Sequence, residues 1–156
     1  KRAGVIDMGI KFANAVALSE RIRDHLTKQR KVSIVEGLGC AYRGADGTMC
    51  AVGCLIKDEH YSTVVEGAAV VSQWRDDKLP EDDDKNKSIF ALKDALTKSL
   101  GRVPTAIDMK AMKLWQEYHD GHYFEHWVKY GVDDESPDSH HETVLSLLEG
   151  EFGTEV

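Results

Sequence analysis

This sequence contains few cysteines, no long apolar run, and no lysine or arginine after Tyr130. Its 156 residues include three cysteines, an odd number for a chain long enough to bury a hydrophobic core without disulfides. This usage is typical of free thiols, so we expect a reducing cytoplasm. No apolar run approaches the roughly 18 residues of a membrane span. Asp7 and Lys11 interrupt the apolar residues at the start, which argues against a signal-peptide core there.

Basic residues are missing after Tyr130, where the chain carries eight acidic ones: Asp133, Asp134, Glu135, Asp138, Glu142, Glu149, Glu151 and Glu155. Taking these eight from the 27 acidic residues leaves 19 against 20 basic ones, so the net charge of −7 arises from residues 131–156. We expect no direct nucleic-acid binding, because such binding depends on basic residues that neutralise phosphates. The acidic segment either occupies a basic groove on a partner or is a solvated surface that aids solubility.

Apolar residues recur at helical spacing along most of the chain, which predicts four or five helices. The expected helices cover residues 7–30, 88–100, 106–120, 123–130 and 139–152, with an acidic loop over 76–87. Ser88 and Thr105 are expected N-cap residues, and Asp108 completes a capping box with Thr105. Gly101 and Gly121 mark helix ends. In the last helix we expect the inward-facing residues to be Val144, Leu147 and Leu148.

Residues 40–67 hold all three cysteines and the clearest turn signal. Asp46-Gly47 is a common turn dipeptide with strand-forming residues on either side, which predicts a β-hairpin. The small apolar segment that follows is expected to be buried, and Gly53 allows another backbone to approach closely. The predicted fold is therefore α+β, a mostly α-helical single domain with a small β-hairpin. It comprises residues 1–130, with an acidic helix or tail over 131–156 packed on it or extending from it.

The cysteines allow three interpretations. With His60 they form a C-x9-C-x3-C-x5-H pattern of donors that zinc accepts, although the spacing is not that of a standard zinc knuckle. Alternatively, Cys50 and Cys54 are small core residues, as free cysteines often are. A third interpretation makes Cys50 a catalytic thiolate at the start of a helix.

Histidines gather near Gly121. On an unbroken helix, His119, His122 and His126 would share one face and form a metal triad. Gly121 interrupts that run and no H-E-x-x-H motif is present, so a surface cluster at a helix end is the alternative. We predict no bound cofactor or metal. If the protein is an enzyme, its candidate catalytic residues are Cys50, Cys54, His119 and Asp120.

Three residues of the predicted hairpin are candidates for partner binding: Tyr42, Arg43 and Asp46. An arginine beside a tight turn can clamp a carboxylate or a phosphate through two hydrogen bonds. It can equally hold its own loop through an internal ion pair with Asp58 or Glu59.

The sequence also contains a distinctive series of short blocks. They are Tyr42-Arg-Gly-x-Asp-Gly47, Cys50-Ala-Val-Gly-Cys-Leu-Ile56, Asp58-Glu59-x-Tyr61, Glu66-Gly67 and Leu114-Trp-Gln-x-x-His119-Asp120, followed by Trp127. These blocks, about a third of the chain, resemble a family of small proteins of phages and prophages. Similar sequences often have proline at Lys57, and the stretches 74–87 and 131–156 look particular to this protein. The family has no assigned activity, so the resemblance implies a phage origin and a shared fold but no reaction.

Together these features predict a phage accessory protein that binds and inhibits a host macromolecular complex in the host cytoplasm. Its target would be a host protein or protein–nucleic acid complex of transcription or defence, such as a CRISPR complex, and no membrane contact is expected. The expected partner-binding residues are Tyr42, Arg43, Asp46, Asp133, Asp134, Glu135 and Asp138. The alternatives are a small metal- or thiol-dependent hydrolase and a structural role through self-association as a homodimer.

Overall fold

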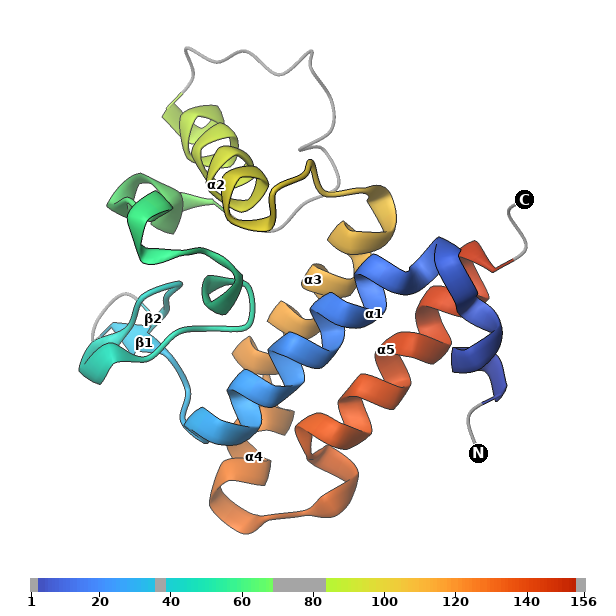
Figure 1. Ribbon diagram of the computed structural model, residues 1–156. Helices are drawn as coiled ribbons and strands as arrows, with labels where there is room; N and C mark the ends of the chain where they lie inside the picture. Colours follow the sequence, from blue (N-terminus) through green and yellow to red (C-terminus); the bar gives the residue numbers. More distant parts are fainter. Residues whose placement is uncertain (1–2, 36–38, 69–83, 154–156) are drawn as a thin grey trace.

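Three helices form the centre of the computed structural model, which describes residues 3–35, 39–68 and 84–153. These are α1 (Ala3–Gln29), α3 (Ala106–Asp120) and α5 (Pro137–Phe152), and α5 runs antiparallel to α1 (Figure 1). The shorter α4 (His122–Tyr130) joins α3 to α5, and α2 (Asp84–Leu100) packs against the segment between residues 53 and 67. The predicted fold class, mostly helical with one small antiparallel hairpin, is confirmed.

The core lies where α1, α3 and α5 meet. The α1 residues that recur at helical spacing are all buried: Phe12, Ala15, Leu18, Ile22 and Leu26. A polar link joins the three helices inside this core, because Ser19 accepts a hydrogen bond from Trp115 Nε1 at 2.8 Å and contacts His141 Nδ1 at 2.7 Å. Since α5 contributes to the core, the acidic segment as far as Phe152 is part of the domain and not an appended tail.

Local capping signals set most helix boundaries. The predicted capping box is confirmed: the Thr105 hydroxyl accepts the Asp108 N–H at 3.2 Å, and the Asp108 carboxylate accepts the Thr105 N–H at 2.8 Å. Gly101 has a φ of +77°, as a helix-ending glycine should. Gly121 separates α3 from α4, as predicted.

Four boundary and orientation predictions were wrong. α1 begins at Ala3 and not at residue 7. α2 begins at Asp84, so Ser88 lies inside it; an acidic residue is favourable at a helix N-terminus. α5 begins at Pro137, where Ser136 caps it by accepting the Ser139 N–H at 3.1 Å. Leu147 is 45% exposed and does not face the core. Of the predicted acidic loop, residues 76–83 lie outside the described residues.

The hairpin lies elsewhere than predicted. β1 (Ile34–Val35) pairs with β2 (Gly39–Cys40), before the Asp46-Gly47 turn. That turn exists as η1 (Ala45–Gly47), in which Asp46 and Gly47 have φ values of +59° and +74°. Only one bridge, Arg43 to Met49, crosses it within the described residues.

Side chains replace the missing strand pairing around this turn. Gln29 holds the Met49 backbone at both ends, accepting its N–H at 2.9 Å and donating to its carbonyl at 3.0 Å. The Glu66 carboxylate accepts the N–H groups of Tyr42 and Arg43 at 3.0 and 3.1 Å. The N–H groups of Tyr42, Arg43 and Met49 and the Met49 carbonyl therefore all have hydrogen-bond partners, and a longer ladder of strand-to-strand hydrogen bonds is not needed here.

The segment after the turn is buried and compact. It contains η2 (Gly53–Leu55) and leads into η3 (Asp58–His60) and η4 (Thr63–Gly67). The predicted close approach at Gly53 is confirmed, because a Cβ there would lie 2.2 Å from the Tyr42 carbonyl oxygen. Within the described ranges, no helix combines the length and apolar character needed to cross a membrane.

Candidate functional site

The break at Gly121 divides the histidine cluster into two groups. His119, at the end of α3, is fully buried, and its Nε2 accepts the Ser33 N–H at 3.0 Å. Its proton is therefore on Nδ1, which donates to Asp120 at 2.8 Å. The predicted triad of His119, His122 and His126 is not assembled, because the latter two histidines belong to α4 and meet Glu135 instead.

Asp120 is the centre of the first group. Its carboxylate accepts hydrogen bonds from His119, from Gln116 at 2.7 Å and from the Cys40 thiol. Burial alone would raise the pKa of Asp120, but these hydrogen bonds hold it below its ordinary value. Partial desolvation of the thiol, together with the Asp120 carboxylate, raises the pKa of Cys40 to about 12, although the residue as a whole is exposed. Because both ring nitrogens of His119 are engaged, this group ties the β1–β2 segment to the end of α3.

A cleft of about 440 Å³ lies beside this group, and Cys50 lines it. Cys50 is 1% exposed, and burial raises the pKa of its thiol far above the ordinary value. Burial also raises the pKa of Cys54 to about 12, and that thiol donates to the Ala51 carbonyl at 3.0 Å. These thiols are protonated at neutral pH, and Cys50 is a core residue, as one of the three interpretations has it. A catalytic role of Cys50 or Cys54 stays a prediction.

The zinc set of Cys40, Cys50, Cys54 and His60, one of the three interpretations of the cysteines, is not assembled. Across the described part of the chain, no three of these four side chains bring ligand atoms within 4.8 Å of one another. Cys40 is exposed and faces Asp120, whereas the nearest acidic partner of His60 is Glu59 at 3.8 Å.

Two of the three loop candidates, Tyr42 and Arg43, face inward. Arg43 donates to the carbonyls of Gly53 and Ile56, both at 2.7 Å, and to Asp58 at 3.1 Å, so the internal alternative for Arg43 is confirmed. Tyr42 is 6% exposed and its hydroxyl donates to the Ala68 carbonyl at 2.5 Å. Asp46 is exposed and pairs with Lys31 at 3.1 Å. Of these three residues only Asp46 presents most of its side chain to solvent, and their role in partner binding stays a prediction.

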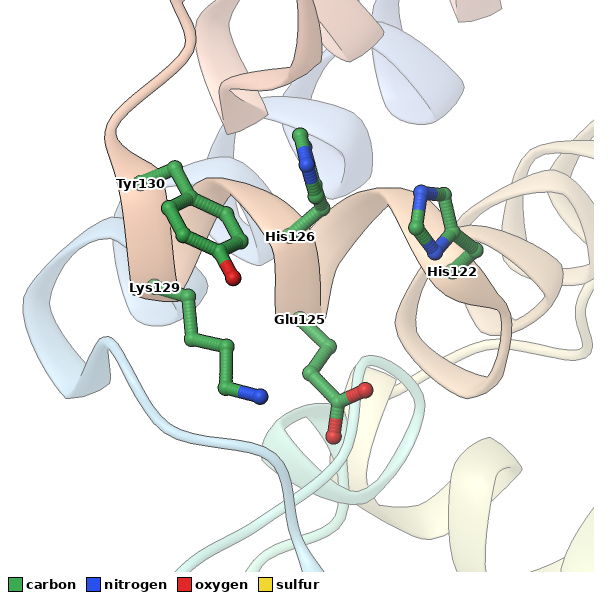
Figure 2. Close-up of a pocket in the computed structure, with 5 residues that line it drawn as sticks. All are labelled: His122, Glu125, His126, Lys129 and Tyr130. Carbon is green, nitrogen blue, oxygen red and sulfur yellow. The ribbon is translucent and has the colours of Figure 1, made fainter.

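The second histidine group lies on α4. Figure 2 shows His122 and His126 with their rings on the same side of the helix, while Glu125 and Lys129 extend to the other side. The ligand atoms of His122, His126 and Glu135 lie within 4.8 Å of one another. His122 and His126 line an open pocket of about 340 Å³ over α4, together with Glu125, Lys129 and Tyr130.

A further pocket, of about 390 Å³, opens between α3, the start of α4 and the chain around η6 (Asp133–Glu135). We call it the acid–aromatic pocket; its lining residues are Leu114, Glu117, Tyr118, Tyr123, Asp134, Glu135, His140 and Thr143. The His140 ring stacks on Tyr118 with centroids 4.3 Å apart and donates from Nε2 to the Leu114 carbonyl at 3.1 Å. Burial lowers the pKa of His140 to about 4, so the ring is neutral at pH 7 and no lining group is cationic.

Uncompensated acidic charge gathers near this pocket. Asp138 pairs with Arg23 at 3.6 Å, and Glu151 pairs with Lys110 at 3.3 Å. Among the residues that the structure describes, Asp133, Asp134 and Glu117 are exposed and form no ion pair. Several exposed large hydrophobic side chains lie on the same stretch of chain: Tyr123, Tyr130, Val132 and Leu147.

Sequence reasoning missed several residues that build these sites. Glu117 and Tyr123 were not predicted as site residues because neither belongs to a motif, although Tyr123 lies in the aromatic run of α4. The roles of Gln29, Ser33 and Glu66 depend on contacts with distant segments and leave no local signal.

Comparison with known proteins gives no match: no family model, no curated protein and no solved structure corresponds to this chain. The resemblance to phage proteins therefore stays an expectation from the sequence blocks.

Proposed function

We propose that this protein is a phage accessory protein that binds and inhibits a host macromolecular complex in the host cytoplasm, using the acid–aromatic pocket. The observation that supports this proposal most directly is the composition of the pocket, which combines tyrosine rings with carboxylates and has no lining cation. Two further features favour a binding role rather than a thiol-dependent reaction: the cysteine thiols are protonated, and both ring nitrogens of His119 already form hydrogen bonds.

The chemistry of the pocket favours a basic side chain of a protein partner. An arginine or lysine can place its charge over the face of Tyr123 and pair with Asp134 or Glu117. Tyrosine is also enriched among the residues that dominate interface energies, and Tyr123 is 60% exposed. Neighbouring carboxylates such as Asp133 would steer a basic surface toward the pocket. Such surfaces are typical of complexes that hold nucleic acid, and covering one would inhibit the complex.

The structure also determines which variants can test this function. Deleting residues 131–156 would remove Val144, Leu145 and Leu148 from the core, so loss of binding in that variant would only report unfolding. Point substitutions at exposed positions avoid this problem. Glu117→Gln/Asp134→Asn removes two carboxylates from the pocket and keeps the side-chain size.

The experiment captures the partner from host lysate with the full chain and then measures association rates for purified variants at two salt concentrations. We expect Glu117→Gln/Asp134→Asn to slow association on the order of tenfold at low salt. The matched control, Glu59→Gln/Asp94→Asn, removes the same charge from exposed positions outside the pocket and should associate like the wild type. Equal rates for the two double variants would refute the proposed role of the pocket.

A further inference from the structure

The two histidines of α4 are spaced for metal binding. His122 and His126 are four residues apart on the helix and therefore share a face, with ring centroids 4.9 Å apart. His122 is exposed, and in the described ranges neither of its ring nitrogens has a hydrogen-bond partner; its contacts are with the rings of Tyr123 and His126. His122 thus has lone-pair capacity that the fold does not use.

A chain reversal brings a carboxylate to this pair. Gly131 ends α4 in the left-handed conformation, with φ +65°, and its N–H donates to the Trp127 carbonyl at 2.7 Å. The chain then turns back through η6, so that the carboxylate of Glu135 hydrogen-bonds His126 Nδ1. The backbone of Glu135 is fixed, because its carbonyl accepts the Tyr118 hydroxyl at 2.6 Å. Two rigid segments therefore present three ligands.

We propose that His122, His126 and Glu135 form a binding site for a divalent transition-metal ion of the zinc type. Two imidazoles and one carboxylate are a donor set that zinc accepts in sites with an open fourth position. With zinc–ligand bonds of about 2.0–2.1 Å, ligand atoms need to lie roughly 3.3 Å apart. The three ligand atoms already lie within 4.8 Å of one another. Rotation of the exposed His122 side chain, together with a widening of the short contact between His126 and Glu135, brings them to this spacing.

The bound ion takes the place of the proton that His126 and Glu135 share in their hydrogen bond. That proton passes to the other ring nitrogen or to solvent, so charge and atoms balance. Both histidines line a pocket of about 340 Å³ (Figure 2), and a water molecule entering it would supply the fourth ligand. This inference does not depend on the proposed function.

The other cluster of potential ligands differs in one decisive respect. The ligand atoms of Cys40, His119 and Asp120 also lie within 4.8 Å of one another. Both ring nitrogens of His119 are engaged, however, one with Ser33 and one with Asp120. An ion there would have to break contacts that hold the β1–β2 segment, whereas the α4 site gives up a single hydrogen bond.

The test titrates the full chain, stripped of metal by a chelator, with Zn²⁺ in a calorimeter and with Co²⁺ by absorption. We expect one ion per chain and a cobalt spectrum of tetrahedral type. Substitution of groups that merely support ligands already costs about 10–100-fold in metal affinity, so His122→Ala and His122→Gln should each lose at least that much. Neither variant removes a hydrogen bond, and their melting temperatures in chelator should equal that of the wild type.

Two control variants locate the site. His60→Ala removes a histidine outside the group, and Cys40→Ser removes the thiol of the competing cluster. Both should bind zinc like the wild type. Absence of stoichiometric zinc binding would overturn the proposal. So would affinity that survives both His122 variants or is lost in Cys40→Ser.

Discussion

Substitution of Arg43 tests which contacts stabilise the loop between residues 43 and 58. Its guanidinium donates to the carbonyls of Gly53 and Ile56, both at 2.7 Å, and to the carboxylate of Asp58 at 3.1 Å. The side chain of Asp58 is 96% exposed, and such ion pairs contribute about 0–1 kcal/mol. A hydrogen bond from a charged donor contributes about 1.5–3 kcal/mol. The carbonyl contacts should therefore provide most of the stabilisation.

The substitution Arg43→Met keeps most of the apolar stem and removes every donor. Two charge-assisted hydrogen bonds would give about 3–6 kcal/mol, and we expect the lower part of that range because the Arg43 side chain is 19% exposed. A loss of about 3–4 kcal/mol corresponds to a fall in Tm of roughly 6–15 °C for a domain of this size. Arg43→Lys should lose about half as much, since one ammonium group reaches only one carbonyl well.

Urea unfolding followed by circular dichroism measures these free energies. The matched control is Asp58→Asn, which removes the ion pair but leaves both carbonyl contacts, and should lose less than about 1 kcal/mol. The reasoning is refuted if Asp58→Asn costs as much as Arg43→Met, because the exposed ion pair would then be the dominant contact. A variant Arg43→Met as stable as the wild type would refute it as well.

Three further predictions concern capping, pH and thiol reactivity. Asp108 is 1% exposed, completes the α3 capping box and also forms an ion pair with Arg102. Asp108→Ala should therefore lose about 2–4 kcal/mol in urea unfolding, against about 1 kcal/mol for Thr105→Ala; equal losses would contradict this order. The pKa of His140 is about 4 in the folded protein and 6.5 in its ordinary state. As the pH falls, this histidine is protonated in the unfolded chain before it is protonated in the folded protein. The free energy of unfolding should therefore fall by about 2–3 kcal/mol between pH 6.5 and pH 4. His140→Asn should make the free energy of unfolding depend less on pH over this range. The thiol of Cys54, with a pKa of about 12, should be alkylated by iodoacetamide at pH 8 on the order of a thousandfold more slowly than in urea, as followed by mass spectrometry.

The helices were predictable because each buries one face, so that apolar residues recur at helical spacing in the sequence. The five recurring apolar residues of α1 are all buried, from Phe12 to Leu26. The capping box of Thr105 and Asp108 was predictable because its two hydrogen bonds involve residues three apart. The break at Gly121 is local in the same way.

The hairpin was misplaced because a turn signal does not determine what pairs with the flanking residues. Asp46 and Gly47 do turn the chain, but Gln29 and Glu66 take the backbone groups that a ladder would use. These two residues lie 20 and 24 positions from the groups that they bind, so no local pattern shows them. The third member of the α4 site, Glu135, was predicted as an acidic partner-binding residue and not as a metal ligand, because its place beside His126 depends on the reversal at Gly131.

Glu135 links the two proposals, since its carboxylate meets His126 while the residue also lines the acid–aromatic pocket. A divalent ion at the α4 site would bring two positive charges to the edge of a pocket whose attraction for a basic partner rests on negative charge. Coupling between two sites is reciprocal in free energy, so a bound basic partner would weaken the metal site by the same factor. The coupling would be negative and would diminish with salt if it acts between exposed charges. Substituting His122 removes the metal effect without touching a residue that lines the acid–aromatic pocket, which separates one proposal from the other.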